Sequence, residues 1–126
     1  MAAITDFRPA NLTVLRKRQD FLRAARALRA PSEGFLLQAR LRNDAETMTA
    51  GITGMRVGFT CSKKVGNAIE RNRAKRRLRE LARLVLPEHG KAGWDYVLIG
   101  RPGVTGTRDF EALKTDLHRA LRKVHG

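Results

Sequence analysis

Hydrophobic residues recur with two different periods along the chain and divide it into helices and strands. Between Lys17 and Ala30 they recur at helical spacing, and Pro31 follows directly, which predicts a helix that ends before the proline. Residues 1–14 show little periodicity and are expected to form an extended, flexible lead-in. Helical spacing returns over residues 109–124, at Phe110, Leu113, Leu117, Leu121 and Val124.

Two segments alternate between apolar and polar residues, which is the pattern of strands with one buried face. They are FLLQARLR at Phe35–Arg42 and MRVGFTCS at Met55–Ser62, and the polar faces carry cations, amide and hydroxyl groups. The connector at 43–54 is rich in turn-forming residues. WDYVLIG at Trp94–Gly100 is apolar on both faces, which predicts an interior strand.

The longest predicted helix runs from Ala68 to Leu86 and is expected to end at Pro87. Asn67 suits the N-cap, because its side-chain oxygen can accept a hydrogen bond from a first-turn N–H group. The apolar stripe of this helix is narrow and is expected to contact the sheet; it consists of Ala74, Leu78, Leu81 and Val85.

The order α-β-β-α-β-α predicts an α/β fold with one domain over residues 1–126. A strand, a long helix and another strand in succession favour a crossover that joins parallel neighbours.

The opposite side of the long helix carries a ridge of polar and cationic residues. This basic ridge consists of Asn72, Lys75, Arg76, Arg79 and Arg83. Between Arg71 and Arg79 there are six cations and no acid, whereas solvated helix faces usually mix both signs. The whole chain carries a formal charge of +14 and a pI near 11.5. Since arginine is suited to bidentate phosphate contacts, nucleic acid is the expected partner.

The segment SKKVGNA, just before the long helix, is expected to add a phosphate site. Lys63 and Lys64 lie near the helix N-terminus, and Gly66 supplies a tight turn. A helix-turn-helix that reads DNA needs a second helix here, but a strand is predicted instead. A membrane-surface protein needs a wide apolar helix face, whereas this stripe is narrow.

The remaining candidate chemistry is sparse. Cys61 is the single cysteine, which excludes an intrachain disulfide, and its place on an apolar strand face favours packing in the core. The three histidines, His89, His118 and His125, are not paired in the sequence, so no protein catalytic site is expected. No apolar run reaches the roughly 20 residues of a membrane span, and a cytoplasmic location is expected.

SKKVGNAIERNRAKRRLRE at Ser62–Glu80 resembles the signature of the protein subunit of bacterial ribonuclease P. The hallmark is Arg-Asn-Arg followed by x-Lys-Arg-x-x-Arg, and here it is formed by Arg71, Asn72, Arg73, Lys75, Arg76 and Arg79. The segments LRKRQDF, FLLQARL, RVGFTCSKK and DYVLIGRPG are similar to the family as well. The resemblance extends over most of residues 12–124.

The resemblance implies an α/β fold of the two-layer α+β sandwich type, in which a mixed sheet has a left-handed parallel β-α-β crossover through the basic helix. It also implies a protein, monomeric by itself, that binds a catalytic RNA subunit and precursor tRNA. The holoenzyme removes the 5′ leader by hydrolysis, and the chemistry and the Mg²⁺ ions belong to the RNA, with no organic cofactor and no catalytic residue in the protein. The implied RNA-subunit contacts are Lys63, Lys64, Asn67, Arg71, Asn72, Arg73, Lys75, Arg76, Arg79 and Arg83.

A cleft between the first helix and the sheet is implied to hold the single-stranded leader. Its expected residues are Phe21, Gln38, Arg40, Arg56, Thr60 and Ser62. Phe21 is either a stacking surface for a base or a core aromatic. Ala25 and Gln38 stand where family members often carry aromatic residues. The alternative function is a binding protein for structured RNA without a catalytic partner, against which only the signature argues.

Overall fold

The computed structural model describes residues 12–43 and 54–126 of the chain. Its strands are β1 (Leu12–Val14), β2 (Leu28–Pro31), β3 (Phe35–Leu41), β4 (Met55–Thr60) and β5 (Trp94–Gly100). Its helices are α2 (Arg18–Ala25), the short 3₁₀-helix η1 (Lys63–Val65), α4 (Ala68–His89) and α5 (Phe110–His125). Residues 1–11 of the predicted lead-in and 44–53 of the predicted connector lie outside the described part.

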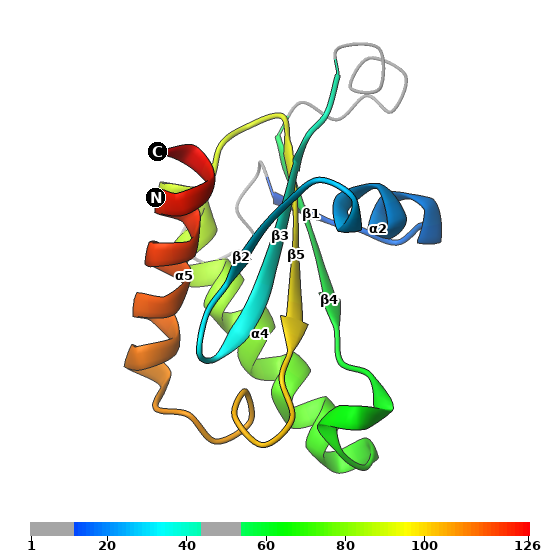
Figure 1. Ribbon diagram of the computed structural model, residues 1–126, viewed down its shortest axis with the longest axis vertical. Coiled ribbons are helices and arrows are strands. Elements are labelled where there is room, and N and C mark those ends of the chain that lie inside the picture. The colour runs from blue at the N-terminus through cyan, green and yellow to red at the C-terminus, as the bar shows by residue number, and fades with distance from the viewer. Residues whose placement is uncertain (1–11, 44–53) are drawn as a thin grey trace, which may run out of the picture.

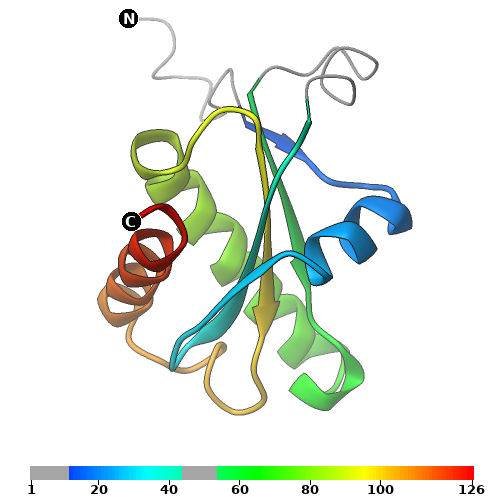
Figure 2. The same cartoon turned by 45° about the horizontal axis from the view of Figure 1, so that its top comes forward.

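The five strands form one mixed sheet in the order β1-β4-β5-β3-β2, and the α/β class is confirmed. β1, β4 and β5 are parallel neighbours, while β3 and β2 pair antiparallel. α4 therefore joins two adjacent parallel strands, as its position in the sequence predicted. Figures 1 and 2 show α4 and α5 on one side of the sheet and α2 on the other.

The main core lies between the sheet and the pair α4 and α5. The predicted stripe of α4 is confirmed, since Ala74, Leu78, Leu81 and Val85 are all buried. β5 is the central strand, with β4 and β3 on its two sides, so the interior strand is confirmed as well. Cys61 is half-buried at the edge of this core, and burial raises the pKa of its thiol.

The predicted helix from Lys17 to Ala30 is wrong in its second half. α2 ends at Ala25, and Leu28–Pro31 forms the edge strand β2 against β3. Leu28 continues the helical spacing but is exposed, whereas Ala30 is buried in the main core through the strand pairing. Pairing with a neighbouring strand overrode the local pattern, and Pro31 is compatible with an edge position.

Two smaller corrections concern β1 and the end of α4. Part of the predicted lead-in, Leu12–Val14, is a strand that pairs in parallel with β4. α4 continues through Pro87 to His89, and the Gly90 N–H donates to the Leu86 carbonyl at 2.8 Å. A proline in the last turn removes only one backbone donor, so the helix continues for two residues beyond it before it ends.

Candidate RNA interface

The N-terminus of α4 is built by reciprocal hydrogen bonds between two side chains. The Asn67 side-chain oxygen accepts from the Glu70 N–H, and the Glu70 carboxylate accepts from the Asn67 N–H, each at 2.9 Å. The predicted cap at Asn67 is thus confirmed as a full capping box. Gly66 before it has a φ of 149°, and a methyl group there would lie 2.3 Å from the Glu70 carboxylate. Only glycine fits this turn.

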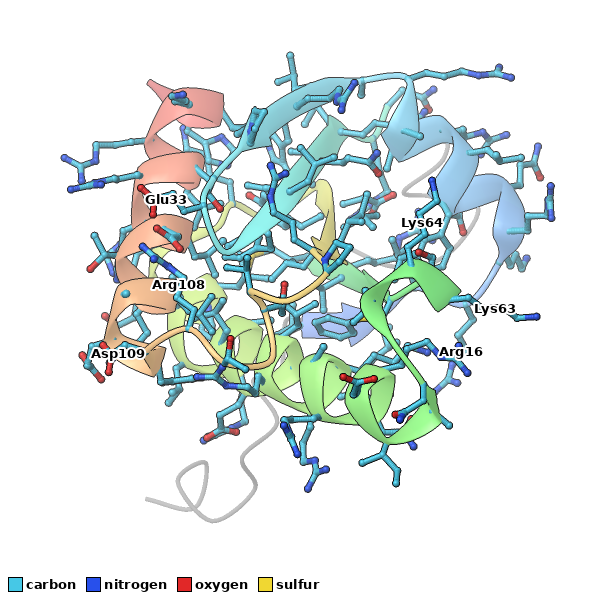
Figure 3. The ribbon with its side chains drawn as sticks, turned by 60° about the horizontal axis from the view of Figure 1, so that its bottom comes forward. Arg16, Glu33, Lys63, Lys64, Arg108 and Asp109 are labelled. Carbon is cyan, nitrogen blue, oxygen red and sulfur yellow. The ribbon has the colours of Figure 1, made fainter. Side chains whose placement is uncertain are left out.

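The basic ridge lies on the outer side of α4, away from the core. Asn72, Arg76 and Arg79 are exposed, and Lys75 and Arg83 are half-buried. The guanidinium of Arg79 lies 6.0 Å from the centre of the Phe59 ring, which steadies it while its charge faces solvent. Figure 3 shows side chains projecting from α4 along this outer side.

Arg83 differs from the rest of the ridge, because it forms an ion pair with Glu80, three residues earlier on the same helix. Its Nε donates to the Glu80 carboxylate at 2.9 Å, and this hydrogen bond lowers the pKa of Glu80. The ridge is therefore most strongly cationic toward the N-terminal half of α4, where the Arg-Asn-Arg signature lies.

Some arginines of the signature region point to solvent, and another is bound within the fold. Arg71 reaches back to the Gly66 carbonyl at 3.4 Å, while Arg73 and Arg76 are exposed. Arg77, on the flank of the apolar stripe, instead donates to the backbone carbonyls of Thr105 and Arg108 and so serves the fold.

The lysines before α4 lie on η1, where both are exposed. Ser62 caps this short helix, since its hydroxyl accepts from the Lys64 N–H at 3.3 Å. Figure 3 shows Lys63, Lys64 and Arg16 at the same end of the molecule, next to α2. Arg16 was missed from the sequence, because the strand pairing of β1 with β4, which brings it there, was not predicted.

The sheet face that α2 covers is the face predicted to bind the leader, and we call it the leader face. Phe21 lies over Gly58 of β4, where a methyl group would be 2.5 Å from the ring. The ring is half-buried and contacts a small apolar cluster of Leu15, Ala24 and Val97. Phe21 is thus part of a small core, and because it is only half-buried, part of its side chain stays accessible to solvent; its role in base stacking stays a prediction.

The other predicted leader contacts differ in their access to solvent. Ser62 is exposed, and Thr60 and Arg40 are half-buried. Gln38 is only 8% exposed, so it lies inside the protein rather than on an open surface. Arg56 is held by Asp95 and Asp20, and its guanidinium is therefore engaged within the fold.

These carboxylates were missed from the sequence. Asp95 is fully buried in an otherwise apolar strand, and that position was the available signal, because a buried carboxylate requires a cation. Its partner was hidden, since the parallel register that sets Arg56 opposite Asp95 is a property of the sheet.

The structure brings together histidines that are far apart in the sequence. The rings of His89 and His118 are 4.4 Å apart, and His125 meets the Tyr96 hydroxyl at 2.7 Å. With Lys91 and Arg122 they line an open hollow of about 540 Å³ at the C-terminal ends of α4 and α5. Burial is the main cause that lowers the pKa of both His118 and His125.

Two wider features bear on the kind of site. Across residues 12–43 and 54–126, no three His, Cys, Asp or Glu side chains are grouped so that they could hold a metal ion. Within the same ranges no helix is long and apolar enough to cross a bilayer. What the described surface offers is a set of exposed cations on α4 and η1, which suits phosphate groups.

Comparisons with known proteins show the family of the chain. The family model described as Ribonuclease P matches residues 10–125. The ribonuclease P protein component of Ruegeria pomeroyi is 61% identical over 116 residues, which cover 92% of this chain and 89% of that protein. The corresponding protein of Gluconacetobacter diazotrophicus is 50% identical over 110 residues, covering 86% and 88% of the two chains.

Solved structures share the fold as well. The RNase P protein from Thermotoga maritima superposes with a TM-score of 0.70 at 28% identity, covering 89% of this chain and 97% of that one. The Staphylococcus aureus RNase P protein gives a TM-score of 0.67 at 26% identity, covering 89% and 94%. The chain therefore belongs to the ribonuclease P protein family, whose members are the protein component of an endoribonuclease that works with an RNA subunit.

Proposed function

We propose that this protein binds the RNA subunit of ribonuclease P through the basic ridge of α4 and the lysines of η1. The observation that carries the proposal is the sorting of α4 into a buried apolar stripe and an exposed cationic side. Clustered like charges destabilise a free helix surface, so an anionic partner stabilises the arrangement. The predicted contacts from Lys63 to Arg83 supply the cations, with Arg83 partly neutralised by Glu80.

We further propose that the leader face receives the 5′ leader of precursor tRNA. Phe21 is half-buried, so part of its side chain is accessible, and base stacking on an aromatic ring contributes about 1–3 kcal/mol per base. Thr60 and Ser62 add hydroxyl groups, and Lys63 and Lys64 add positive charge at the same end of β4. This order of groups suits a single strand with bases on one side and phosphates on the other.

The chemistry in this proposal belongs to the RNA. A surface with a formal charge of +14 attracts phosphates and repels divalent cations, so we assign the Mg²⁺ ions to the RNA subunit. The protein stabilises the RNA–substrate complex by neutralising phosphates and lowers the Mg²⁺ concentration that cleavage requires. We propose that it acts in the cytoplasm and enters the complex as a monomer, which sedimentation of the free protein tests.

Cleavage of precursor tRNA at low Mg²⁺ tests the function directly. The cognate RNA subunit is assayed alone and then with the protein, and the product ends are mapped. Restored cleavage at the mature 5′ end is the expected result. Tight RNA binding without stimulation of cleavage would point to a binding protein for structured RNA instead. Cleavage by the protein without RNA would show that the chemistry belongs to the protein and not to the RNA.

A further inference from the structure

A chain of ion pairs runs under α2 and connects this helix to the sheet. Arg56 of β4 donates to both carboxylate oxygens of Asp95, at 2.8 and 2.6 Å. Its Nη1 also lies 3.2 Å from the carboxylate of Asp20 on α2. Arg42, directly after β3, completes the chain from the other side at 2.6 Å from Asp95. Arg23, on the same helix as Asp20, lies 3.8 Å from the Asp20 carboxylate and adds a more exposed third cation.

This series of ion pairs is buried, and the pairs among Arg42, Asp95 and Arg56 form without any contribution from α2. The side chains of Arg42 and Asp95 are each 1% exposed, and Arg42 also donates to the carbonyls of Trp94 and Gly54. Arg56 and Asp95 are direct cross-strand neighbours in the parallel register of β4 and β5. Asp20, whose side chain is 10% exposed, is the member that extends the chain to α2.

The apolar contact of α2 with the sheet is small. Among the described residues, the cluster between them contains three buried residues, Leu15, Val97 and Ala24 of α2 itself, whereas the main core on the other side of the sheet contains seventeen. A charge-assisted hydrogen bond is stronger than a neutral one, and more so when it is shielded from water. The contact between Asp20 and Arg56 therefore adds a directional link between this helix and the sheet.

The residue that follows Asp20 is Phe21, whose ring lies on Gly58. A change in the position of α2 shifts this ring and alters the space between the helix and the sheet. Because Asp95 and Asp20 occupy the guanidinium of Arg56, Arg56 itself is not available to a phosphate group. The solvent-accessible hydroxyl groups of this face lie at Thr60, which is half-buried, and Ser62, which is exposed.

We propose that the ion pair of Asp20 and Arg56 positions Phe21 and thereby sets how well the protein distinguishes precursor tRNA from mature tRNA. Both are positioning residues, because they act through α2 and do not contact the leader. The inference rests on the proposed function, in which the leader lies on this face. It also replaces the predicted direct contact of Arg56 with the leader by an indirect role.

The test measures the affinity of the reconstituted holoenzyme for precursor and for mature tRNA. Asp20→Asn keeps the shape of the side chain and removes its charge. The ratio of the two affinities is expected to fall about three- to tenfold in this variant. In the Phe21→Ala background, Asp20→Asn is expected to change the ratio no further, because the ring that it positions is gone.

Asp116→Asn is the matched control. Asp116 is a buried carboxylate that accepts from Arg108 Nε at 2.8 Å, but it lies on α5, on the other side of the sheet. Asp116→Asn is expected to lower the melting temperature without changing the affinity ratio. A merely structural role of Asp20 predicts the same behaviour for both variants.

Each outcome decides between the hypotheses. An unchanged ratio in folded Asp20→Asn overturns the inference, and so does an effect that persists in full without Phe21. If Asp20→Asn does not fold, Arg56→Lys replaces it, since one ammonium group cannot hold both carboxylates; an unchanged ratio there also overturns the inference. A wild-type holoenzyme that does not prefer precursor over mature tRNA refutes the proposed leader contact itself.

Discussion

Arg77, in the middle of α4, donates from Nη1 to the backbone carbonyl of Thr105 at 2.9 Å. Its second terminal nitrogen donates to the carbonyl of Arg108, and its guanidinium lies 5.9 Å from the centre of the Phe110 ring. An arginine within the most basic stretch of the chain thus fastens the turn between β5 and α5. Its immediate neighbour, Arg76, is exposed.

Arg77→Met should therefore destabilise the fold, while Arg76→Met should not. Loss of the Arg77 donors leaves two carbonyls without these partners, and the free energy of unfolding should fall by about 2 kcal/mol. For Arg76→Met the expected change is within about 0.5 kcal/mol. Urea unfolding of both variants measures the difference, and equal values would mean that the contacts of Arg77 contribute nothing.

Arg76→Ala should weaken binding to the RNA subunit. Each phosphate contact contributes about one unit to the slope of log affinity against log salt, so the slope should become shallower by about one. Arg119→Ala removes the same charge from the exposed side of α5 and serves as the control. Equal slopes for wild type and Arg76→Ala across a salt titration would show that Arg76 makes no contact with the phosphates of the RNA.

Leu78→Ala should be strongly destabilising, because Leu78 is fully buried in the main core. Truncation of a buried leucine typically lowers the free energy of unfolding by about 2–5 kcal/mol. Leu84 lies on the same helix but is 42% exposed, and Leu84→Ala should have a much smaller effect. Chemical denaturation of both variants checks the assignment of the two faces of α4.

Acidification should destabilise the protein through His125 and His118. Burial is the main cause that lowers the pKa of each in the folded chain, so the unfolded chain binds more protons as the pH falls through about 6.5. Stability from these groups is present above this pH and is lost toward the lowered pKa values. The double variant His118→Gln, His125→Gln should flatten the dependence between pH 7.5 and 5.5, within about one unit of that pKa.

Trp94 offers a direct readout for that experiment, because it is the single tryptophan and lies 4.6 Å from the His125 ring. Its fluorescence follows both unfolding and protonation of the neighbouring imidazole. A stability curve that is flat in the wild type over this range would contradict the lowered pKa values.

Tyr96 should ionise only at high pH. Burial is the main cause that raises its pKa to about 12, and its hydroxyl accepts from the Lys91 N–H at 2.9 Å. Because the unfolded tyrosine titrates near pH 10, the stability from Tyr96 is intact below that value and is lost as the pH rises toward 12. Tyr96 is the only tyrosine, so phenolate absorbance reports it alone; a native midpoint equal to that in urea would contradict the burial.

Much of the helical interface was predictable from residue order alone. The apolar stripe of α4, the cap at Asn67 and the turn at Gly66 depend on interactions between residues a few positions apart. The basic ridge follows from the same helical period. For this reason the predicted placement of the cations agrees with the structure, apart from the contact of Arg83 with Glu80.

Two of the errors have a common cause in strand pairing. Leu28–Pro31 was predicted as helix and Leu12–Val14 as lead-in, and both became strands because β3 and β4 offered them partners. The spacing of apolar residues within such a segment can be read from the sequence, but the strand with which it pairs cannot. Tertiary pairing therefore outweighed local preference at both edges of the sheet.

By itself, then, the sequence determined the fold class, the faces of α4 and the family of the protein, because these rest on local periodicity and on a contiguous signature. Only the tertiary structure decided which charges remain open to RNA. Arg56 was predicted on an open polar strand face, and Arg77 on the flank of the apolar stripe. In the structure Asp95 engages Arg56 and the Thr105 carbonyl engages Arg77, both within the fold. The physical reason is that the partners of a charge are set by contacts between residues distant in the chain, and no periodicity records those contacts.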